Sequence, residues 1–242
     1  MRRGAIVRVV TIGLLAAAAA TAVAILIPWL PKNESKEGTR IDFVFWVVIA
    51  ICIGVFAVVA AVTIYSVVKF RVAPDDDSDG PPIHGHTGIE IAWTAIPTIL
   101  VTVIAILSAV ALADNGKLQA NRLQVDVTAQ QFFWSFKYPQ YGGFKTSELR
   151  LVEGRQVELN LRALDVIHSF WVPEFRQKQD AVPGIVTHLP ITPTKVGRRT
   201  LVCTELCGLG HALMRAPVIV MKADAFDKWA RAQEQASQGS TG

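Results

Sequence analysis

The chain has 242 residues, a formal net charge of +4 and a hydrophobic content of 51%. Its length allows one or two domains. The hydrophobic content is too high for an ordinary soluble protein, and the apolar residues gather in three long runs in the first half of the chain.

These apolar runs cover residues 9–27, 43–68 and 91–113, and none of them contains a charge. They are 19, 26 and 23 residues long. About 20 apolar residues in a helix cross a hydrocarbon core of roughly 30 Å. Each run is therefore predicted to form a transmembrane helix. A buried helix of a soluble protein can be as apolar, but three in half a chain are not expected.

Basic residues flank one end of the first two runs, with Arg2, Arg3 and Arg8 before the first and Lys69 and Arg71 after the second. Cytoplasmic flanks of membrane helices carry an excess of lysine and arginine. Both flanks are therefore expected in the cytoplasm. Residues 28–42 and everything after Asp114 are then outside.

The first run allows two interpretations. It has a basic start and small-residue cleavage patterns near Ala20 to Ala24, as a secretory signal has, but its apolar stretch is longer than a usual signal core. Residues 1–30 are therefore either a signal peptide or an extra transmembrane helix. Residues 31–115 are expected to form a transmembrane helical hairpin, 116–230 an outer domain and 231–242 a disordered tail.

The pattern changes after the third run. Residues 123–128 and 156–162 alternate apolar and polar side chains, which is typical of half-buried strands. Further strands are expected at 200–202 and 216–221, and an amphipathic helix at 225–236. Short strands separated by glycine and proline indicate an all-β sandwich or barrel, although alternation alone does not choose between β folds.

The most informative motif is Cys203-Thr-Glu-Leu-Cys207-Gly-Leu-Gly-His211-Ala-Leu-Met214. Its thiols, imidazole and thioether are spaced by four, four and three residues, and His168 lies 35 residues before Cys203. Thiolate and thioether ligands favour copper, and imidazole also binds it well. Two cysteines four apart in a tight loop can each bridge two metal ions. The set therefore predicts a two-copper electron-transfer centre.

A disulfide and a zinc site are the alternatives for this loop. A disulfide between Cys203 and Cys207 is conceivable in an oxidising compartment. Zinc uses other pair spacings, and methionine is a poor zinc ligand. A mononuclear blue-copper site needs only one cysteine. The third cysteine, Cys52, lies in the second apolar run and is expected to pack as a small hydrophobe.

With these motifs the chain resembles subunit II of the haem-copper cytochrome c oxidases, over about residues 28–230. Besides the metal loop, the resemblance is carried by Pro81–His86, Glu90–Pro97, Gln130–Pro139, Asp165–Pro173 and Asp180–Gly184. The metal loop with its upstream histidine is highly specific. The membrane segments alone would be a weak match.

The resemblance implies a fold and a metal site. The fold is membrane-anchored and all-β, with a transmembrane hairpin followed by a cupredoxin-like Greek-key barrel. By position, the ligands of the family's dinuclear copper centre are His168, Cys203, Cys207, His211 and Met214, with the backbone carbonyl of Glu205. The Glu205 carboxylate matches a magnesium ligand at the subunit I interface, a solvated or ion-paired glutamate being the alternative.

Acidic residues outside the loop have matches as well. Glu90, at the start of the third run, matches an acid at the mouth of a proton-uptake route into subunit I. The alternative is a glutamate that stabilises the N-terminus of its helix. Asp165 and Asp180 match acids beside the copper region, with a buried structural carboxylate as the alternative.

The position at which the family accepts electrons departs from the usual pattern. The family often has a tryptophan where this chain has Phe132, and Trp134 aligns with a second, more structural tryptophan. From Gly116 onward, sixteen Lys/Arg less eleven Asp/Glu leave a net charge of plus five. Relatives that dock a basic cytochrome c present acidic residues, because opposite potentials steer the encounter. Electrons are therefore expected to enter at Phe132 and Trp134 from a less basic donor, or from a cytochrome domain held in a supercomplex.

The function implied by the resemblance is electron input to an oxidase. The chain would take electrons from a cytochrome c or a cytochrome c domain and pass them to haem in subunit I, where oxygen is reduced to water and protons are translocated. No residue of this chain is expected to be catalytic by itself. Subunit III and the bilayer are further partners, nucleic acid is not, and the location is a prokaryotic plasma membrane with the copper domain outside. The alternatives are the copper-bearing subunit of a nitric oxide reductase and a membrane-anchored copper carrier.

Overall fold

The structure is a computed structural model, and the residues that it describes are 3–72, 75, 79–80, 82 and 84–239. Positions 81 and 83 of the Pro81–His86 stretch lie outside them, as do positions 240–242 of the expected tail. The chain forms two compact units. One contains residues 1–29 and 43–110, and the other contains residues 30–42 and 111–242.

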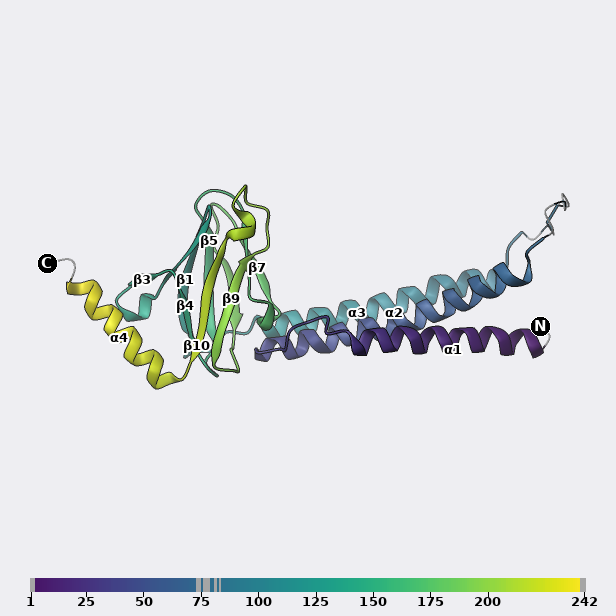
Figure 1. The fold of residues 1–242 in the computed structure, drawn as a ribbon, viewed down its shortest axis with the longest axis horizontal. Helices are drawn as coiled ribbons and strands as arrows, with labels where there is room; N and C mark the ends of the chain where they lie inside the picture. The colour runs from purple at the N-terminus through teal and green to yellow at the C-terminus, as the bar shows by residue number, and fades with distance from the viewer. Residues whose placement is uncertain (1–2, 73–74, 76–78, 81, 83, 240–242) are drawn as a thin grey trace. The chain divides into compact units, whose positions relative to one another are not determined.

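Three long helices dominate the chain's first half (Figure 1). Helix α1 covers Arg3–Leu26, α2 covers Lys36–Lys69 and α3 covers Thr87–Asn115. All three are long and apolar enough to cross a membrane. Most of their apolar side chains are exposed, as expected for helices whose solvent is lipid. The three predicted runs are confirmed as helices that are long and apolar enough to span a membrane.

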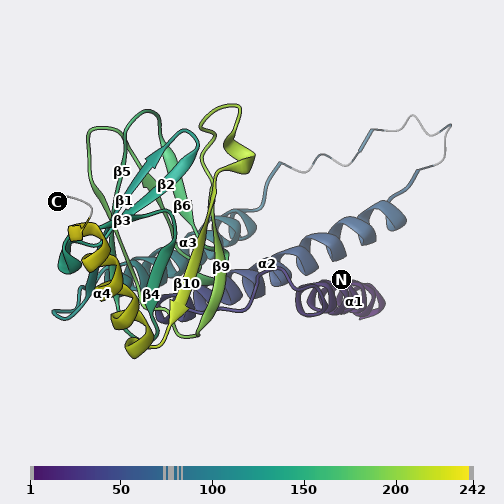
Figure 2. The same ribbon diagram turned by 60° about the vertical axis from the view of Figure 1, so that its left-hand side comes forward.

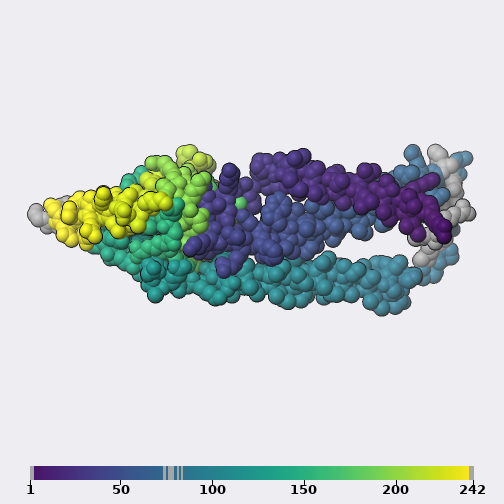
Figure 3. Space-filling view, turned by 90° about the horizontal axis from the view of Figure 1, so that it is seen from below, coloured from purple at the N-terminus to yellow at the C-terminus, as the bar shows by residue number. Residues whose placement is uncertain are grey.

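Helices α1 and α2 pack closely through small residues, and Figure 3 shows them side by side. A Cβ atom added to Gly13 would lie 3.5 Å from the Cβ of Ala61 and 3.7 Å from the carbonyl oxygen of Ala57. Both alanines are buried. Small residues let membrane helices approach each other in this way.

Ten strands form two five-stranded sheets (Figures 1 and 2). The first sheet has the order β3-β2-β1-β5-β8, and these strands are Lys145–Thr146, Phe133–Lys137, Leu123–Gln130, Val157–Ala163 and Thr187–Ile191. The second has the order β4-β10-β9-β6-β7, with strands Leu149–Val152, Arg215–Met221, Gly197–Cys203, His168–Trp171 and Lys178–Ala181. Short 3-10 helices are η1 Pro139–Tyr141, η2 Pro173–Phe175 and η3 His211–Leu213. The four predicted strands are confirmed, and the domain is of the expected cupredoxin-like kind.

One hydrophobic core lies between the two sheets. Alternate residues of β1 are buried, as the period of two requires, and among them Val125 and Val127 have no exposed surface. Leu159 of β5, Leu201 of β9 and Val218 of β10 are equally buried in the same cluster. Burying one such side chain stabilises a fold by about 1.5–3 kcal/mol. The result is a rigid frame for the loops at its ends.

Helix α4 covers Ala223–Gly239 and corrects the prediction of a disordered tail from residue 231. Its inner face carries Phe226 and Trp229, whose rings lie 6.2 and 5.2 Å from the ring of the buried Tyr138. The residues that follow are mostly good helix formers, so the anchored helix continues through Gly239.

Residues 30–42 belong with the β unit, although the sequence placed residues 31–42 with the membrane hairpin. Glu34 is ion-paired with Arg199 of β9. The Arg176 Nε donates to Asp42 at 2.6 Å. Because Glu34 and Asp42 are paired with arginines of the β-domain, residues 30–42 belong to that domain, although the apolar runs of the sequence suggested otherwise.

Candidate metal centre

The metal loop joins β9 to β10 at one end of the β-domain. Cys203 ends β9, Met214 precedes β10, and the Cys203 N–H donates to the Met214 carbonyl at 3.1 Å. This bond closes the base of the loop. Cys203, Cys207 and Met214 are all buried. The loop therefore presents its sulfur atoms to the interior from two adjacent, well-anchored strands.

All five predicted side-chain ligands meet in one cluster. The Cys203 and Cys207 Sγ atoms are 3.9 Å apart, and His168 Nδ1 is 3.9 Å from the Cys203 sulfur. His211 Nδ1 and Met214 Sδ lie 3.6 and 3.8 Å from the Cys207 sulfur. Both cysteines are free thiols, and their separation is almost twice the roughly 2.05 Å of a disulfide bond. The arrangement fits a metal site and not a disulfide.

The environment of Cys207 disfavours a free thiolate. Burial raises the pKa of the Cys207 thiol to about 11, and the neighbouring Cys203 adds to the rise. The metal-free thiol is therefore protonated at neutral pH. Because a metal binds the thiolate, its binding must displace that proton.

His168 reaches the cluster from β6, the strand next to β9. Its ring is fully buried, and its Nε2 lies 2.9 Å from Asp165 Oδ1, so its Nδ1 faces the sulfur atoms. Asp165 also accepts the backbone N–H groups of Gln131 and Val166 at 2.7 Å each. Burial raises the pKa of Asp165, but these hydrogen bonds and His168 together outweigh it and hold the pKa below its usual value. The carboxylate thus orients the histidine, as outer partners of metal ligands do.

Trp134 lies in the interior, against this histidine. Its side chain is 2% exposed, and its ring meets those of His168 and Phe170 edge-on at 6.2 and 6.0 Å. The tryptophan is therefore not available at the surface to an incoming electron donor. It packs directly behind a candidate ligand.

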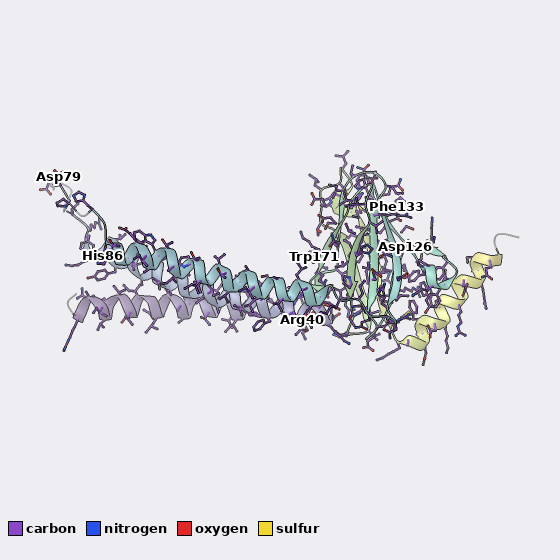
Figure 4. All side chains as sticks on the ribbon, turned by 180° about the vertical axis from the view of Figure 1, so that it is seen from behind. Arg40, Asp79, His86, Asp126, Phe133 and Trp171 are labelled. Atoms are coloured by element: carbon purple, nitrogen blue, oxygen red, sulfur yellow. The ribbon has the colours of Figure 1, made fainter. Side chains whose placement is uncertain are left out.

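Phe132 lies at the surface, in the turn between β1 and β2, and its ring packs against the metal loop. It is 39% exposed, and its neighbour Phe133, which begins β2 and is labelled in Figure 4, is 51% exposed. A Cβ added to Gly210 would approach the Phe132 ring to 2.5 Å, closer than any real contact. Only glycine allows the ring to rest there. The structure thus brings Phe132 to the metal loop.

An apolar rim around the loop was missed by sequence reasoning. Leu206, Leu209 and Leu213 of the loop are at least 80% exposed. Exposed apolar groups that gather in one place mark interaction sites more often than scattered ones do. The sequence signal that could have predicted this rim was the presence of three leucines in the short loop that also holds the ligands.

Two family descriptions match this sequence. "Cytochrome C oxidase subunit II, periplasmic domain" matches residues 146–223, and "Cytochrome C oxidase subunit II, transmembrane domain" matches residues 30–110. Cytochrome c oxidase subunit 2 of Thermostichus vulcanus is 33% identical, over 86% of this chain and 79% of that protein. The chain belongs to the cytochrome c oxidase subunit II family.

Two further matches are also subunit II proteins. The one from Synechocystis sp. (strain ATCC 27184 / PCC 6803 / Kazusa) is 31% identical, over 86% of this chain and 76% of that protein. The crystal structure of the periplasmic domain of subunit II from Bradyrhizobium japonicum aligns with 49% of this chain and 97% of that chain, at 27% identity and a TM-score of 0.47.

Membership of the subunit II family implies a dinuclear copper centre, and the donor set fits one. His168, Cys203 and Cys207 each offer an atom within 4.8 Å of the others, and all three are buried. Two sulfur atoms side by side, each with its own imidazole, suit a pair of soft ions better than one. The nearby thioether fits copper and not zinc.

Glu205 contributes to the cluster through its backbone. Its carbonyl oxygen lies 3.3 Å from the Cys203 Sγ, where the family's carbonyl ligand is expected. Its carboxylate belongs to an exposed residue. Magnesium binding by that carboxylate stays a prediction.

Glu90 lies in the first turn of helix α3, and its side chain reaches back along the chain. Its Oε1 accepts the backbone N–H of His86 at 3.0 Å, so the carboxylate helps to cap the helix. Glu90 also lines a groove of about 620 Å³ on α3, together with Thr94 and Thr98. The capping alternative thus has direct support, and proton uptake stays a prediction.

Proposed function

We propose that this chain is the electron-input subunit of a cytochrome c oxidase, whose subunit I reduces oxygen to water while protons are translocated. The observation that carries the proposal is the meeting of two buried thiols, two imidazoles and a thioether in one cluster. When bound, the copper pair supplies a one-electron relay between a cytochrome c and the haem of subunit I. The side chains that would hold it are His168, Cys203, Cys207, His211 and Met214, with the Glu205 carbonyl.

The β-domain contributes a site that moves little. The metal loop is closed by the hydrogen bond between Cys203 and Met214, and His168 is fixed by Asp165. The buried sulfur atoms are shielded from water. A ligand set held in this way keeps nearly the same geometry in both oxidation states, so each electron transfer needs little reorganisation.

The full chain, purified in detergent and loaded with copper, tests the proposal. Copper per chain and the electron paramagnetic resonance spectrum would be measured. Two coppers with a seven-line signal, from one electron shared by both nuclei, are expected. One copper with a four-line signal, or none, would overturn the proposal. The comparisons support the oxidase and give no support to a nitric oxide reductase subunit or a copper carrier.

We propose that the electron donor docks on Phe132 and the apolar rim of Leu206, Leu209 and Leu213. Support comes from their exposure beside the cluster and from the net charge of plus five after residue 116. A surface of that sign does not attract a strongly basic cytochrome c. The donor is therefore a less basic cytochrome c or a tethered cytochrome domain, which apolar contact and proximity hold in place.

Replacing Phe132 by alanine is expected to lower the second-order rate of electron uptake by roughly tenfold or more, as loss of an aromatic anchor costs about 2 kcal/mol or more of binding. The copper spectrum should not change. Stopped-flow reduction of the variant by a set of cytochromes c of different charge measures the effect. Phe133→Ala, which removes the adjacent exposed ring, is the control. Fast reduction by a basic cytochrome c that falls steeply with added salt would contradict the proposed docking mode.

We propose that the chain sits in a prokaryotic plasma membrane beside subunits I and III, with the β-domain outside. Support comes from the three spans and from the basic residues that flank the first two. The exposed Glu205 carboxylate would then bind magnesium at the subunit I interface, and Glu90 would serve proton uptake on the opposite side.

Glu90→Gln separates proton uptake from helix capping. Glutamine keeps an oxygen that accepts the His86 N–H, so the cap survives, but it cannot bind and release a proton at neutral pH. Oxygen uptake by the assembled oxidase is expected to slow severalfold while reduction of the copper centre by its donor keeps its rate. Unchanged turnover would contradict a role of Glu90 in proton uptake and leave helix capping as its only role.

A further inference from the structure

One residue of the β1–β2 turn contacts both sides of the metal cluster. The Gln131 side-chain Nε2 donates to the Cys207 carbonyl at 2.5 Å. Its backbone N–H donates to Asp165 Oδ2 at 2.7 Å, and the other oxygen of that carboxylate contacts His168 Nε2 at 2.9 Å. Gln131 is thus hydrogen-bonded directly to the Cys207 backbone, and it is linked to His168 through the carboxylate of Asp165.

The metal loop leaves room for this amide at one point. Gly208, directly after Cys207, has a φ of +131°, which favours glycine. A Cβ at that position would lie 2.9 Å from Gln131 Nε2 and 3.2 Å from the ring of Phe132. Any other residue would push the glutamine away from the carbonyl. The loop and the turn therefore have complementary shapes.

The hydrogen bond also fixes which way the amide points. A carbonyl only accepts, so the atom facing Cys207 must be the nitrogen of Gln131. β6 and the start of the metal loop are already joined by backbone, because Phe170 pairs with Cys203 and the Thr204 N–H donates to the Ser169 carbonyl at 3.0 Å. Gln131 adds a second connection, from the Cys207 end of the loop to Asp165, the carboxylate that holds His168.

We propose that Gln131 is a positioning residue that sets the separation of the Cys207 sulfur and the His168 imidazole before and after copper binds. It is not a ligand. Outer partners of metal ligands orient those ligands, and their loss typically costs about 10- to 100-fold in metal affinity or activity. This inference rests on the proposed function, because it assigns a role within the same copper site.

The test uses the full chain in detergent with copper bound. Gln131→Met keeps the length of the side chain and the backbone bond to Asp165, but removes the donor. Gln131→Glu places a second acceptor against the Cys207 carbonyl. The matched control is Gln140→Met. Gln140 lies away from the metal loop, and its Nε2 likewise donates to a backbone carbonyl, that of Arg122, at 3.3 Å.

Two readouts report on the site independently of activity. Copper release to a chelator is expected to quicken about tenfold in Gln131→Met and further in Gln131→Glu, in line with the loss of an outer partner. The hyperfine spacing of the seven-line signal should change in both. Gln140→Met should match the wild type in both readouts.

Each other outcome is decisive. Wild-type release and an unchanged signal in Gln131→Met would overturn the inference and leave the proposed function intact. A thermal midpoint lowered equally in Gln131→Met and Gln140→Met, with an unchanged signal in both, would show an ordinary structural brace and also overturn it. Absence of the two-copper signal in the wild type would instead be a failure of the proposed function.

Discussion

Replacing Cys207 by serine is expected to abolish the two-copper centre while the β-domain stays folded. The Cys207 sulfur contacts the Cys203 sulfur, His211 and Met214 at 3.9, 3.6 and 3.8 Å, so it lies at the centre of the cluster. Serine keeps the shape, but its hydroxyl is neither soft nor ionised at neutral pH. Loss of an outer partner costs about 10- to 100-fold in metal affinity, and loss of a thiolate that would itself be a ligand should cost more.

Copper per chain, the electron paramagnetic resonance spectrum and oxygen uptake by the assembled oxidase measure this effect. The matched control is Cys52→Ser, which makes the same change at a free, exposed cysteine of α2. That control should retain both coppers and full activity. If Cys207→Ser kept two coppers and a seven-line signal, the proposed ligand role of Cys207 would be refuted and the cluster would need another explanation.

The copper site could be predicted from the sequence because most of its ligands are local. Cys203, Cys207, His211 and Met214 lie within one loop, so their spacing alone restricts the chemistry. His168 was predicted from its residue type and then matched by the family resemblance, since nothing in local spacing brings a residue 35 positions away into contact. Which histidine nitrogen faces the sulfur atoms, and which partner holds it there, could not be read from the chain.

The role of Gln131 and the burial of Trp134 depend on strand pairing. Both follow because the turn between β1 and β2 lies beside the metal loop. The alternation of apolar and polar residues predicts strands, but it does not reveal such a long-range arrangement. The same holds for residues 30–42. They precede a transmembrane run and so look like part of the hairpin. Their carboxylates, however, find partners in Thr192 directly after β8, in Arg199 of β9 and in Arg176 directly after η2.

Replacing Arg199 by methionine is expected to destabilise the β unit by about 3–5 kcal/mol, the usual cost of breaking a buried ion pair. The side chains of Arg199 and its partner Glu34 are each only 9% exposed. Without the guanidinium, Glu34 keeps Lys195 at 3.3 Å, whose own side chain is 64% exposed. A largely buried carboxylate would thus lose its main counter-charge. Urea unfolding of the full chain, followed by tryptophan fluorescence, measures the loss.

Arg198 provides the matched control on the same strand. Its side chain is 66% exposed and pairs with Glu148 at 3.6 Å, so Arg198→Met should cost no more than about 1 kcal/mol. Equal losses in the two variants would show that burial gives the Arg199 pair no special weight. The double variant Glu34→Gln with Arg199→Met should be less unstable than the sum of the single variants, because neither charge is then left alone.

The same ion pair decides which fragment of the chain can carry the copper site. A fragment that begins at residue 116 contains every proposed ligand but lacks Glu34 and also Glu37, whose carboxylate accepts the N–H and hydroxyl of Thr192 at 2.8 Å each. Arg199 would then be left without its partner, as it is in Glu34→Gln. We expect the urea midpoint of such a fragment to lie below that of the full chain. The decrease should be at least as large as the decrease caused by Arg199→Met. If the two unfold together, residues 30–42 add nothing to the stability of the copper domain.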